Sequence, residues 1–519
     1  MDLKLFNNCC TEKIANTVFV PLMFLLFTFV AYIQWLLLNY LEWCDESETV
    51  VAAKMITSGR ALYSEIFNNH GPLTFFFGVI IETVGNFSVP EHRIPVALMQ
   101  LLILFFLLRI PLVESKFAKA VSTLIASLAF VFIFPGFLGH TAQYDIFAGI
   151  LLAMAAIHYI IPAFVDREKL SGRSIALGNF LIGCTGFMAL TYWPSLLLIF
   201  LLSLRRNYVH TAFKWLGISI AANLTFLIII GSIKGYIAEH LYFNLAVLSS
   251  YMGMDLTAVL KSIIVSFSNQ QMLAFGLIVS AGILMFYEKS LFPWRTFFLV
   301  TAILLFFMRG PSFHAMSGIY LLTVLFSVAV SVIIDNLKKQ HVVFIFAFSV
   351  SLIFIFTHVN QHVTLLKSHT FPRQSPFSQL VKRITAKEDR IIAYSFRNVE
   401  YLLADRLPAS GNFFLLPSQV NYNQNPILGI AIDECKDISD YKPKVMFIDK
   451  LKRRNISWET YGSCVQKIID ADYSQVVDGK PYYIRNDLLD DLGITLSNDG
   501  SAAIQKSDAK GLSNTIINF

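Results

Sequence analysis

The sequence predicts a polytopic α-helical membrane protein with a small α/β domain at its C-terminal end. Of the 519 residues, 55% are hydrophobic and only 15% are charged, whereas about one-quarter of the residues of a soluble domain are charged. Apolar runs of about twenty residues, the length that crosses a bilayer, recur before residue 360. The residues that follow return to the charge content of a soluble protein. We therefore expect a membrane domain at residues 1–360 and an α/β domain at residues 361–519.

The number of spans depends on the second apolar run, residues 72–88. The first run, 17–41, is too long for a signal-peptide core and predicts an uncleaved span. Residues 72–88 are short for a span and contain Glu82. If they do not cross, five short basic loops share one side, as the positive-inside rule requires; these are "ESKFAK", "DREKLSGR", "RRNYVHTAFK", "YEKSLFPWR" and "DNLKKQH". We therefore expect about eleven spans, with 72–88 dipping into the outer leaflet and the C-terminal domain outside.

The C-terminal part of the chain carries short strand patterns separated by helical ones. "RIIAYS", "KVMFID" and "KPYYIRN" predict strands, and residues 375–386 and 456–471 predict helices. The six cysteines have no spacing typical of metal ligands. Cys435 and Cys464 are compatible with a disulfide in an oxidising compartment and equally with two unpaired thiols.

The segment that follows the first span, "DESETVVAAKMITSGRALYSEIFNNHGPL", combines charge with helix signals. Residues 46–58 contain no Gly or Pro and predict an amphipathic surface helix that Gly59 ends. Asp45 suits the N-cap of this helix, and Glu48 would complete a capping box. A carboxylate at a helix N-terminus is also held ionised, as a general base requires. The spacing alone does not choose between capping and catalysis.

Further polar residues are predicted at the same outer surface. His70, Asn68 and Asn69 precede Gly71-Pro72, where the chain re-enters the lipid, and they suit either a phosphate site or a water-filled turn. A second acid begins the later span in "FPGFLGHTAQYDIFAGILLAMAA", and two cationic groups lie in "FFMRGPSFHAMSGIYLL". An arginine at such a position binds phosphate or extends to lipid head groups. The residues concerned are Tyr144, Asp145, Arg309 and His314.

The order and spacing of these motifs resembles the GT-C superfamily of glycosyltransferases. These integral membrane enzymes use polyprenyl-phosphate sugars, and they include aminoarabinose transferases for lipid A and protein O-mannosyltransferases. The resemblance spans residues 17–359. The matching positions are Asp45-Glu46, Gly59, Tyr63, His70-Gly71-Pro72-Leu73, "EHRIP", "YDIFAGILLAMA" and "SFHAMSGIYLL".

The resemblance implies a role for each candidate residue. Asp45 would be the catalytic base, and Asp145 and Glu46 would orient the acceptor or a metal ion. His70, Arg309 and His314 would bind the donor phosphate, although relatives often have lysine at the position of His70. The acceptor and its loop would involve Tyr63, Asn69 and Tyr144. No cofactor is certain, and a divalent metal ion stays open.

Size and layout resemble the bacterial enzymes that glucosylate O-antigen from undecaprenyl-phosphate glucose. This resemblance implies an enzyme of the bacterial inner membrane that inverts the anomeric centre, with its active site and C-terminal domain in the periplasm. Its partners would be the lipid-linked donor, a glycan such as O-antigen or lipopolysaccharide, and the bilayer. The net charge of +6 lies mainly in loops between spans and indicates no nucleic-acid partner. A lipid-linked glycan flippase or polymerase is the alternative, but such a protein would place charges within its spans. A structural membrane subunit is a third possibility.

Overall fold

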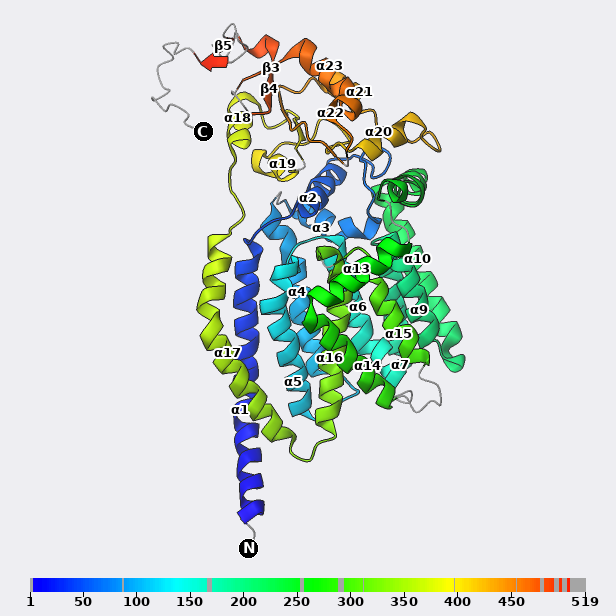
Figure 1. Ribbon diagram of the computed structural model, residues 1–519, viewed down its shortest axis with the longest axis vertical. Coiled ribbons are helices and arrows are strands. Elements are labelled where there is room, and N and C mark those ends of the chain that lie inside the picture. The colour runs from blue at the N-terminus through cyan, green and yellow to red at the C-terminus, as the bar shows by residue number, and fades with distance from the viewer. Residues whose placement is uncertain are drawn as a thin grey trace.

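A computed structural model of the chain describes residues 3–504, except 86–87, 166–169, 253–255, 288–293, 311, 396, 454, 477–479, 490–493 and 497–501. The described residues form a long helical body with a mixed α/β region at one end (Figure 1). Helices α2 and α3 lie at the end of the body that faces the α/β region (Figure 1). Residues from both parts share one hydrophobic core, which includes Val51, Phe67, Phe377 and Phe447.

Seven described helical segments are long and apolar enough to cross a membrane, or eight if a bent pair counts as one span. The helices in these seven segments are α1 (Leu3–Leu38), α4 (Val89–Leu108), α5 (Lys116–Leu128), α6 (Tyr144–Ala155) with α7 (Ile161–Val165), α10 (Val209–Ile230), α16 (Met316–Asp335) and α17 (Gln340–Ser368). Helices α1 and α17 pack side by side on one flank (Figure 1).

The remaining apolar runs form shorter helices, and the predicted count of about eleven spans is therefore not confirmed. Residues 174–204 divide into two helices. The first ends at Gly186, and the second begins at Trp193 with Pro194 in its first turn. The shorter or bent elements are α8 (Gly172–Gly186), α9 (Trp193–Ser203), α11 (Ile233–Gly235), the π-helix η7 (Tyr236–Leu248), α12 (Ser249–Met252), α13 (Leu256–Asn269), α14 (Gln271–Tyr287) and α15 (Trp294–Leu305).

Within the apolar run 72–88, residues 72–84 form a short helical segment that does not have the length of a span. The 3-10 turn η1 (Pro72–Phe75) and α3 (Phe76–Val84) contain 4 and 9 residues, about 20 Å of helix against a hydrocarbon core of about 30 Å. Gly78 allows close packing, since a Cβ there would lie 2.8 Å from the side chain of Ala53. Glu82 fixes α3 further through His92 at 2.8 Å and Lys54 at 3.3 Å.

Helix α2 (Cys44–Thr57) differs from its prediction in two ways. It starts two residues early, at Cys44, because the carbonyl of Trp43 accepts the N–H groups of Glu46 and Ser47. Asp45 therefore lies in the first turn, and the predicted cap and its capping box with Glu48 are wrong. The helix is also buried between the two parts of the chain rather than exposed on a surface, since residues 50–53 have no solvent exposure.

The C-terminal region begins where α17 ends at Ser368, so the predicted boundary at residue 360 falls inside that helix. Its four-stranded sheet has the order β1-β2-β4-β3, with β1 parallel to β2 and the other pairs antiparallel. The three predicted strands correspond to β1 (Ile392–Tyr394), β2 (Val445–Ile448) and β4 (Tyr482–Arg485), whereas β3 (Tyr473–Gln475) was not anticipated. A separate two-stranded sheet pairs β5 (Ile494–Leu496) with β6 (Ala502–Ile504).

Helices surround this four-stranded sheet and a disulfide joins two of them. The predicted helical segments correspond to α18 (Pro376–Ile384) and to α22 (Trp458–Tyr461) with α23 (Ser463–Asp472). Cys435 and Cys464 form a disulfide with a Cα–Cα distance of 6.2 Å, which settles a pairing that the sequence left open. The additional helices are α19 (Val399–Ala404), α20 (Pro417–Gln424) and α21 (Glu434–Tyr441).

Candidate active site

Ionisable side chains gather where α2, the loop of residues 58–71, the start of α6 and the segment before α16 meet. Asp145 is 1% exposed and lies in the first turn of α6. One of its oxygens lies 3.1 Å from Nδ1 of His314, and the other accepts a hydrogen bond from the hydroxyl of Tyr192. Because both oxygens are occupied, Asp145 fixes the imidazole of His314 rather than standing free.

Tyr144 links this acid to two cationic groups. Its hydroxyl lies 3.1 Å from Nδ1 of His314 and accepts an N–H from the guanidinium of Arg309. Its ring stacks on the imidazole of His70, with centroids 4.3 Å apart and planes inclined by 28°. Tyr144 is itself 1% exposed. It therefore holds one arginine and two histidines in a fixed arrangement, and it does not line an open acceptor loop as the sequence predicted.

Asp45 is the carboxylate of this group that stays partly exposed. Its only described side-chain partner is the thiol of Cys44, whose Sγ lies 3.3 Å from Oδ1. Loss of surrounding water raises the pKa of Asp45, while the charges of His314 and Arg309 act in the opposite direction. The charge of Asp145 raises this pKa further. The structure thus places Asp45 within electrostatic reach of Asp145, Arg309 and His314.

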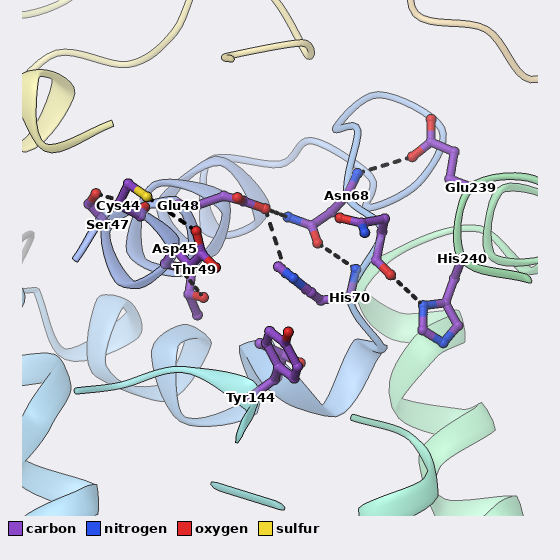
Figure 2. Close-up of polar contacts among 12 residues, drawn as sticks. Cys44, Asp45, Ser47, Glu48, Thr49, Asn68, His70, Tyr144, Glu239 and His240 are labelled. Atoms are coloured by element: carbon purple, nitrogen blue, oxygen red, sulfur yellow. Dashed lines mark hydrogen bonds and ion pairs between the residues drawn. The ribbon is translucent and has the colours of Figure 1, made fainter. Parts of the chain in front are cut away.

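Glu48 also faces this group, and the sequence had suggested only a capping role for it. Glu48 follows Asp45 by three residues and so lies on the same side of α2. Its Oε1 accepts an N–H from Nδ2 of Asn68 at 2.8 Å and lies 3.6 Å from Nδ1 of His70 (Figure 2). The spacing of Asp45 and Glu48 on a helix was the signal in the sequence that would have identified this second acid.

Burial changes the protonation of Glu48 and His70. Desolvation, with a further contribution from the charge of Asp45, raises the pKa of Glu48 well above its usual value. Desolvation also lowers the pKa of His70 well below its usual value, and the charge of Arg309 lowers it further. Burial thus favours the protonated carboxyl of Glu48 and the neutral imidazole of His70.

Two predicted acceptor residues instead build the loop that carries His70. Tyr63 has no exposure, adopts a φ of 68° and donates its hydroxyl to the carbonyl of His70 at 2.6 Å. The carbonyl of Asn69 accepts from Nδ2 of Asn244 at 2.7 Å and lies 2.8 Å from Nδ1 of His240. The backbone of this loop is thereby fixed from two sides, and the prediction that Tyr63 and Asn69 contact the acceptor is not supported by their contacts.

Glu46 is a second correction, because it lies outside the polar group at Asp45. It has no exposure, and its two oxygens bind the guanidinium of Arg93 at 2.7 and 2.6 Å. One of them also accepts the backbone N–H of Ala142 at 2.8 Å. Arg93 belongs to the "EHRIP" motif and further donates to carbonyl oxygens at the C-terminal end of α1. With no free oxygen, Glu46 joins α1, α2 and α4 and cannot orient an acceptor.

The described His, Cys, Asp and Glu side chains do not form a metal site. Within the part of the chain that the structure describes, no three His, Cys, Asp or Glu side chains are placed to hold a metal ion together. Asp145 uses its oxygens on Tyr192 and His314, and Glu46 uses its oxygens on Arg93. The two acids that the sequence offered as metal ligands thus have other partners.

Comparison with known proteins identifies the fold. No protein-family model matches the sequence, and no characterised protein matches it in a sequence search. ArnT from Cupriavidus metallidurans in the apo state is similar in structure, with a TM-score of 0.51 at 12% identity over 89% of this chain and 98% of ArnT. ArnT belongs to the GT-C superfamily. The chain has a GT-C fold.

Two further solved structures align over much of the chain. The same ArnT bound to undecaprenyl phosphate has a TM-score of 0.49 at 14% identity, over 74% of this chain and 85% of ArnT. The oligosaccharyltransferase AglB from Archaeoglobus fulgidus, in complex with an inhibitory peptide and a dolichol-phosphate, has a TM-score of 0.45 at 10% identity. That alignment covers 94% of this chain and 74% of AglB.

Proposed function

We propose that the chain is a membrane glycosyltransferase that moves a sugar from a polyprenyl-phosphate carrier to a hydroxyl of a glycan. The observation that carries this proposal is Asp45, a partly exposed carboxylate on which the charges of Arg309 and His314 act. Transfer from a phosphate needs a base for the incoming hydroxyl and cations for the departing phosphate. The shared fold with ArnT supports a lipid-linked donor, and ArnT has been crystallised with undecaprenyl phosphate.

Within this proposal, each step of the reaction is given to a residue. Asp45 removes the proton of the acceptor hydroxyl, and the oxygen attacks the anomeric carbon of the donor sugar. The bond from that carbon to the phosphate oxygen breaks on the opposite side, so the configuration inverts. Arg309 and His314 stabilise the charge that develops on the phosphate. Asp145 holds the imidazole of His314 and keeps it directed into the site.

The donor sugar, the acceptor and the orientation are finer parts of the same proposal. The sequence resemblance favours undecaprenyl-phosphate glucose as donor and O-antigen or lipopolysaccharide as acceptor. An orientation with the C-terminal region in the periplasm of a bacterial inner membrane is supported by the disulfide between Cys435 and Cys464, since disulfides persist in oxidising compartments. The basic loops predicted on the opposite side support the same orientation.

The test replaces the proposed base without changing its size. Asp45→Asn removes the ionisable oxygen and keeps the side-chain volume, so membrane insertion and folding should be retained. Transfer of labelled sugar from undecaprenyl-phosphate sugars should fall by about 10²- to 10⁴-fold, the usual contribution of a general base. The matched control is Glu388→Gln at an exposed acid of the C-terminal region, which should keep full activity. Near-normal turnover by Asp45→Asn would refute the assignment.

A further inference from the structure

The mechanism above does not use the pair formed by Glu48 and His70. Nδ1 of His70 is buried and has no hydrogen-bond partner among the described residues. Oε1 of Glu48 lies 3.6 Å from it, which is too long for a hydrogen bond. The side chain of His70 is 12% exposed and that of Glu48 is 9% exposed. Catalytic hydrogen bonds are often long before substrate binds, so this pair is placed to exchange a proton once the two atoms close to hydrogen-bonding distance.

Both ends of this pair lie against groups that change charge during transfer. Glu48 shares a face of α2 with Asp45, and Asn68 is its other neighbour. The ring of His70 stacks on Tyr144, whose hydroxyl binds Arg309, and the charges of Arg309, His240 and His314 act on it. Glu48 lies between Asp45 and His70 (Figure 2), so the pair extends from the proposed base toward the residues proposed to bind phosphate.

The charge of the site changes at both of these sides in one turnover. Before transfer, Asp45 is ionised and the donor phosphodiester carries one negative charge. Two adjacent carboxyls do not both ionise readily in a buried site, so Glu48 keeps its proton while Asp45 is ionised. After transfer, Asp45 holds the proton of the acceptor and the released phosphate carries two negative charges. A cation is then needed near the phosphate, and ionisation of Glu48 is no longer opposed.

We propose that Glu48 is a positioning residue that holds a proton and passes it to His70 as the phosphate departs. This inference rests on the proposed glycosyltransferase function. The O–H bond of Glu48 breaks and an N–H bond forms at Nδ1 of His70, so no outside donor is required. The negative charge that Asp45 loses is replaced on Glu48, and the imidazolium of His70 offsets the second charge of the phosphate. The total charge of the three side chains, the donor and the acceptor is the same before and after.

A purely structural role for Glu48 makes a different prediction. In that case Glu48 only anchors Asn68, whose Oδ1 accepts the backbone N–H of His70 at 2.9 Å and so holds the loop. Glu48→Gln keeps an oxygen that accepts from Asn68, and it removes the transferable proton. Glu48→Gln therefore retains the hydrogen bond from Asn68 that holds the loop and removes only the proton transfer.

The experiment compares pH–rate profiles of purified protein with labelled undecaprenyl-phosphate sugar and a glycan acceptor. In the wild type, the rate should fall as pH rises through the raised pKa of Glu48, because the proton to be passed is lost. Glu48→Gln should lower kcat by about 10²-fold with little change in KM for the donor, and should abolish this alkaline fall. The control, Glu65→Gln, alters an exposed acid of the same loop that accepts the N–H of Ala61. This variant should retain the wild-type profile.

A second variant keeps the test valid if Glu48→Gln does not fold. His70→Lys supplies a fixed positive charge, so the alkaline fall should move to higher pH, and adding Glu48→Gln should have little further effect. An unchanged rate and profile in Glu48→Gln, or an unchanged alkaline fall in His70→Lys, would overturn the proton transfer. A wild type that consumes no polyprenyl-phosphate sugar would instead refute the proposed function.

Discussion

Replacing Arg93 by alanine should destabilise the helical body strongly, because one guanidinium serves three segments. Arg93 is 1% exposed and binds both oxygens of Glu46, which has no exposure at all. It also donates to the carbonyls of Leu37 at 3.0 Å, Tyr40 at 2.6 Å and Leu41 at 3.1 Å. The last carbonyls of a helix have no partners within the helix, so Arg93 acts as the C-terminal cap of α1.

The magnitude follows from what the substitution leaves behind. Removing one partner of a buried ion pair costs about 3–5 kcal/mol, since the other charge stays buried without compensation. The freed carbonyls add to this cost, although such contributions are not additive. We therefore predict a loss of at least about 3 kcal/mol in the free energy of unfolding for Arg93→Ala. Adding Glu46→Gln should recover part of that loss, because a neutral amide is buried at lower cost than a carboxylate.

The assay is denaturant-induced unfolding in mixed micelles, followed by tryptophan fluorescence. Arg373→Ala, at an exposed arginine of the C-terminal region, is the matched control and should lie within about 0.5 kcal/mol of the wild type. Two results would refute the reasoning about Arg93. One is a loss below about 1 kcal/mol in Arg93→Ala. The other is a double variant that is less stable than Arg93→Ala.

Five further predictions concern the site, the topology and the disulfide. Asp145→Asn should lower kcat by about 10²-fold by releasing His314, and an unaltered kcat would remove Asp145 from the mechanism. Because burial raises the pKa of Asp45, transfer should be lost as pH falls through a value above the usual aspartate pKa of about 3.9. Arg309→Gln should move this acidic limb to higher pH, since its charge lowers the pKa of Asp45, and a shift to lower pH would contradict that sign. A reporter fused after Thr370 should be active outside the cytoplasm, whereas cytoplasmic activity would invert the topology. Cys464→Ser should lower the stability of the C-terminal region by about 2–4 kcal/mol in thermal unfolding, and an unshifted transition would count against the disulfide.

The sequence predicted those parts of the fold that depend on local pattern. Alternation and turn residues identified the strands around Ala393, Phe447 and Tyr483, because each strand is short and bounded by polar residues. The sequence also singled out the run that begins at residue 72 as short for a span, and its described helical part, residues 72–84, has the length of η1 and α3 alone. The span count was harder to predict, because the length and hydropathy of a run such as Gln271–Tyr287 or Trp294–Leu305 do not show whether its helix is long enough to cross.

The sequence predicted only those site residues that a local pattern reveals. Asp45 and Asp145 stood out because each acid lies at the end of an apolar run, and the structure places them within electrostatic reach. The partners of other residues depend on contacts far apart in the chain. Glu46 and Arg93 are 47 positions apart, and no local pattern shows that they bind each other. The same holds for Glu48 and His70, whose pairing depends on how the loop folds back over α2.

The most direct measurement is the product analysis of a single turnover by the purified protein. Undecaprenyl-phosphate sugar labelled at the anomeric carbon is mixed with a candidate glycan, and the products are followed by NMR. The proposed mechanism predicts equal amounts of undecaprenyl phosphate and a glycoside of inverted configuration, and neither product with Asp45→Asn. Retention of configuration, or equal product formation by the wild type and Asp45→Asn, would contradict direct displacement with Asp45 as the base.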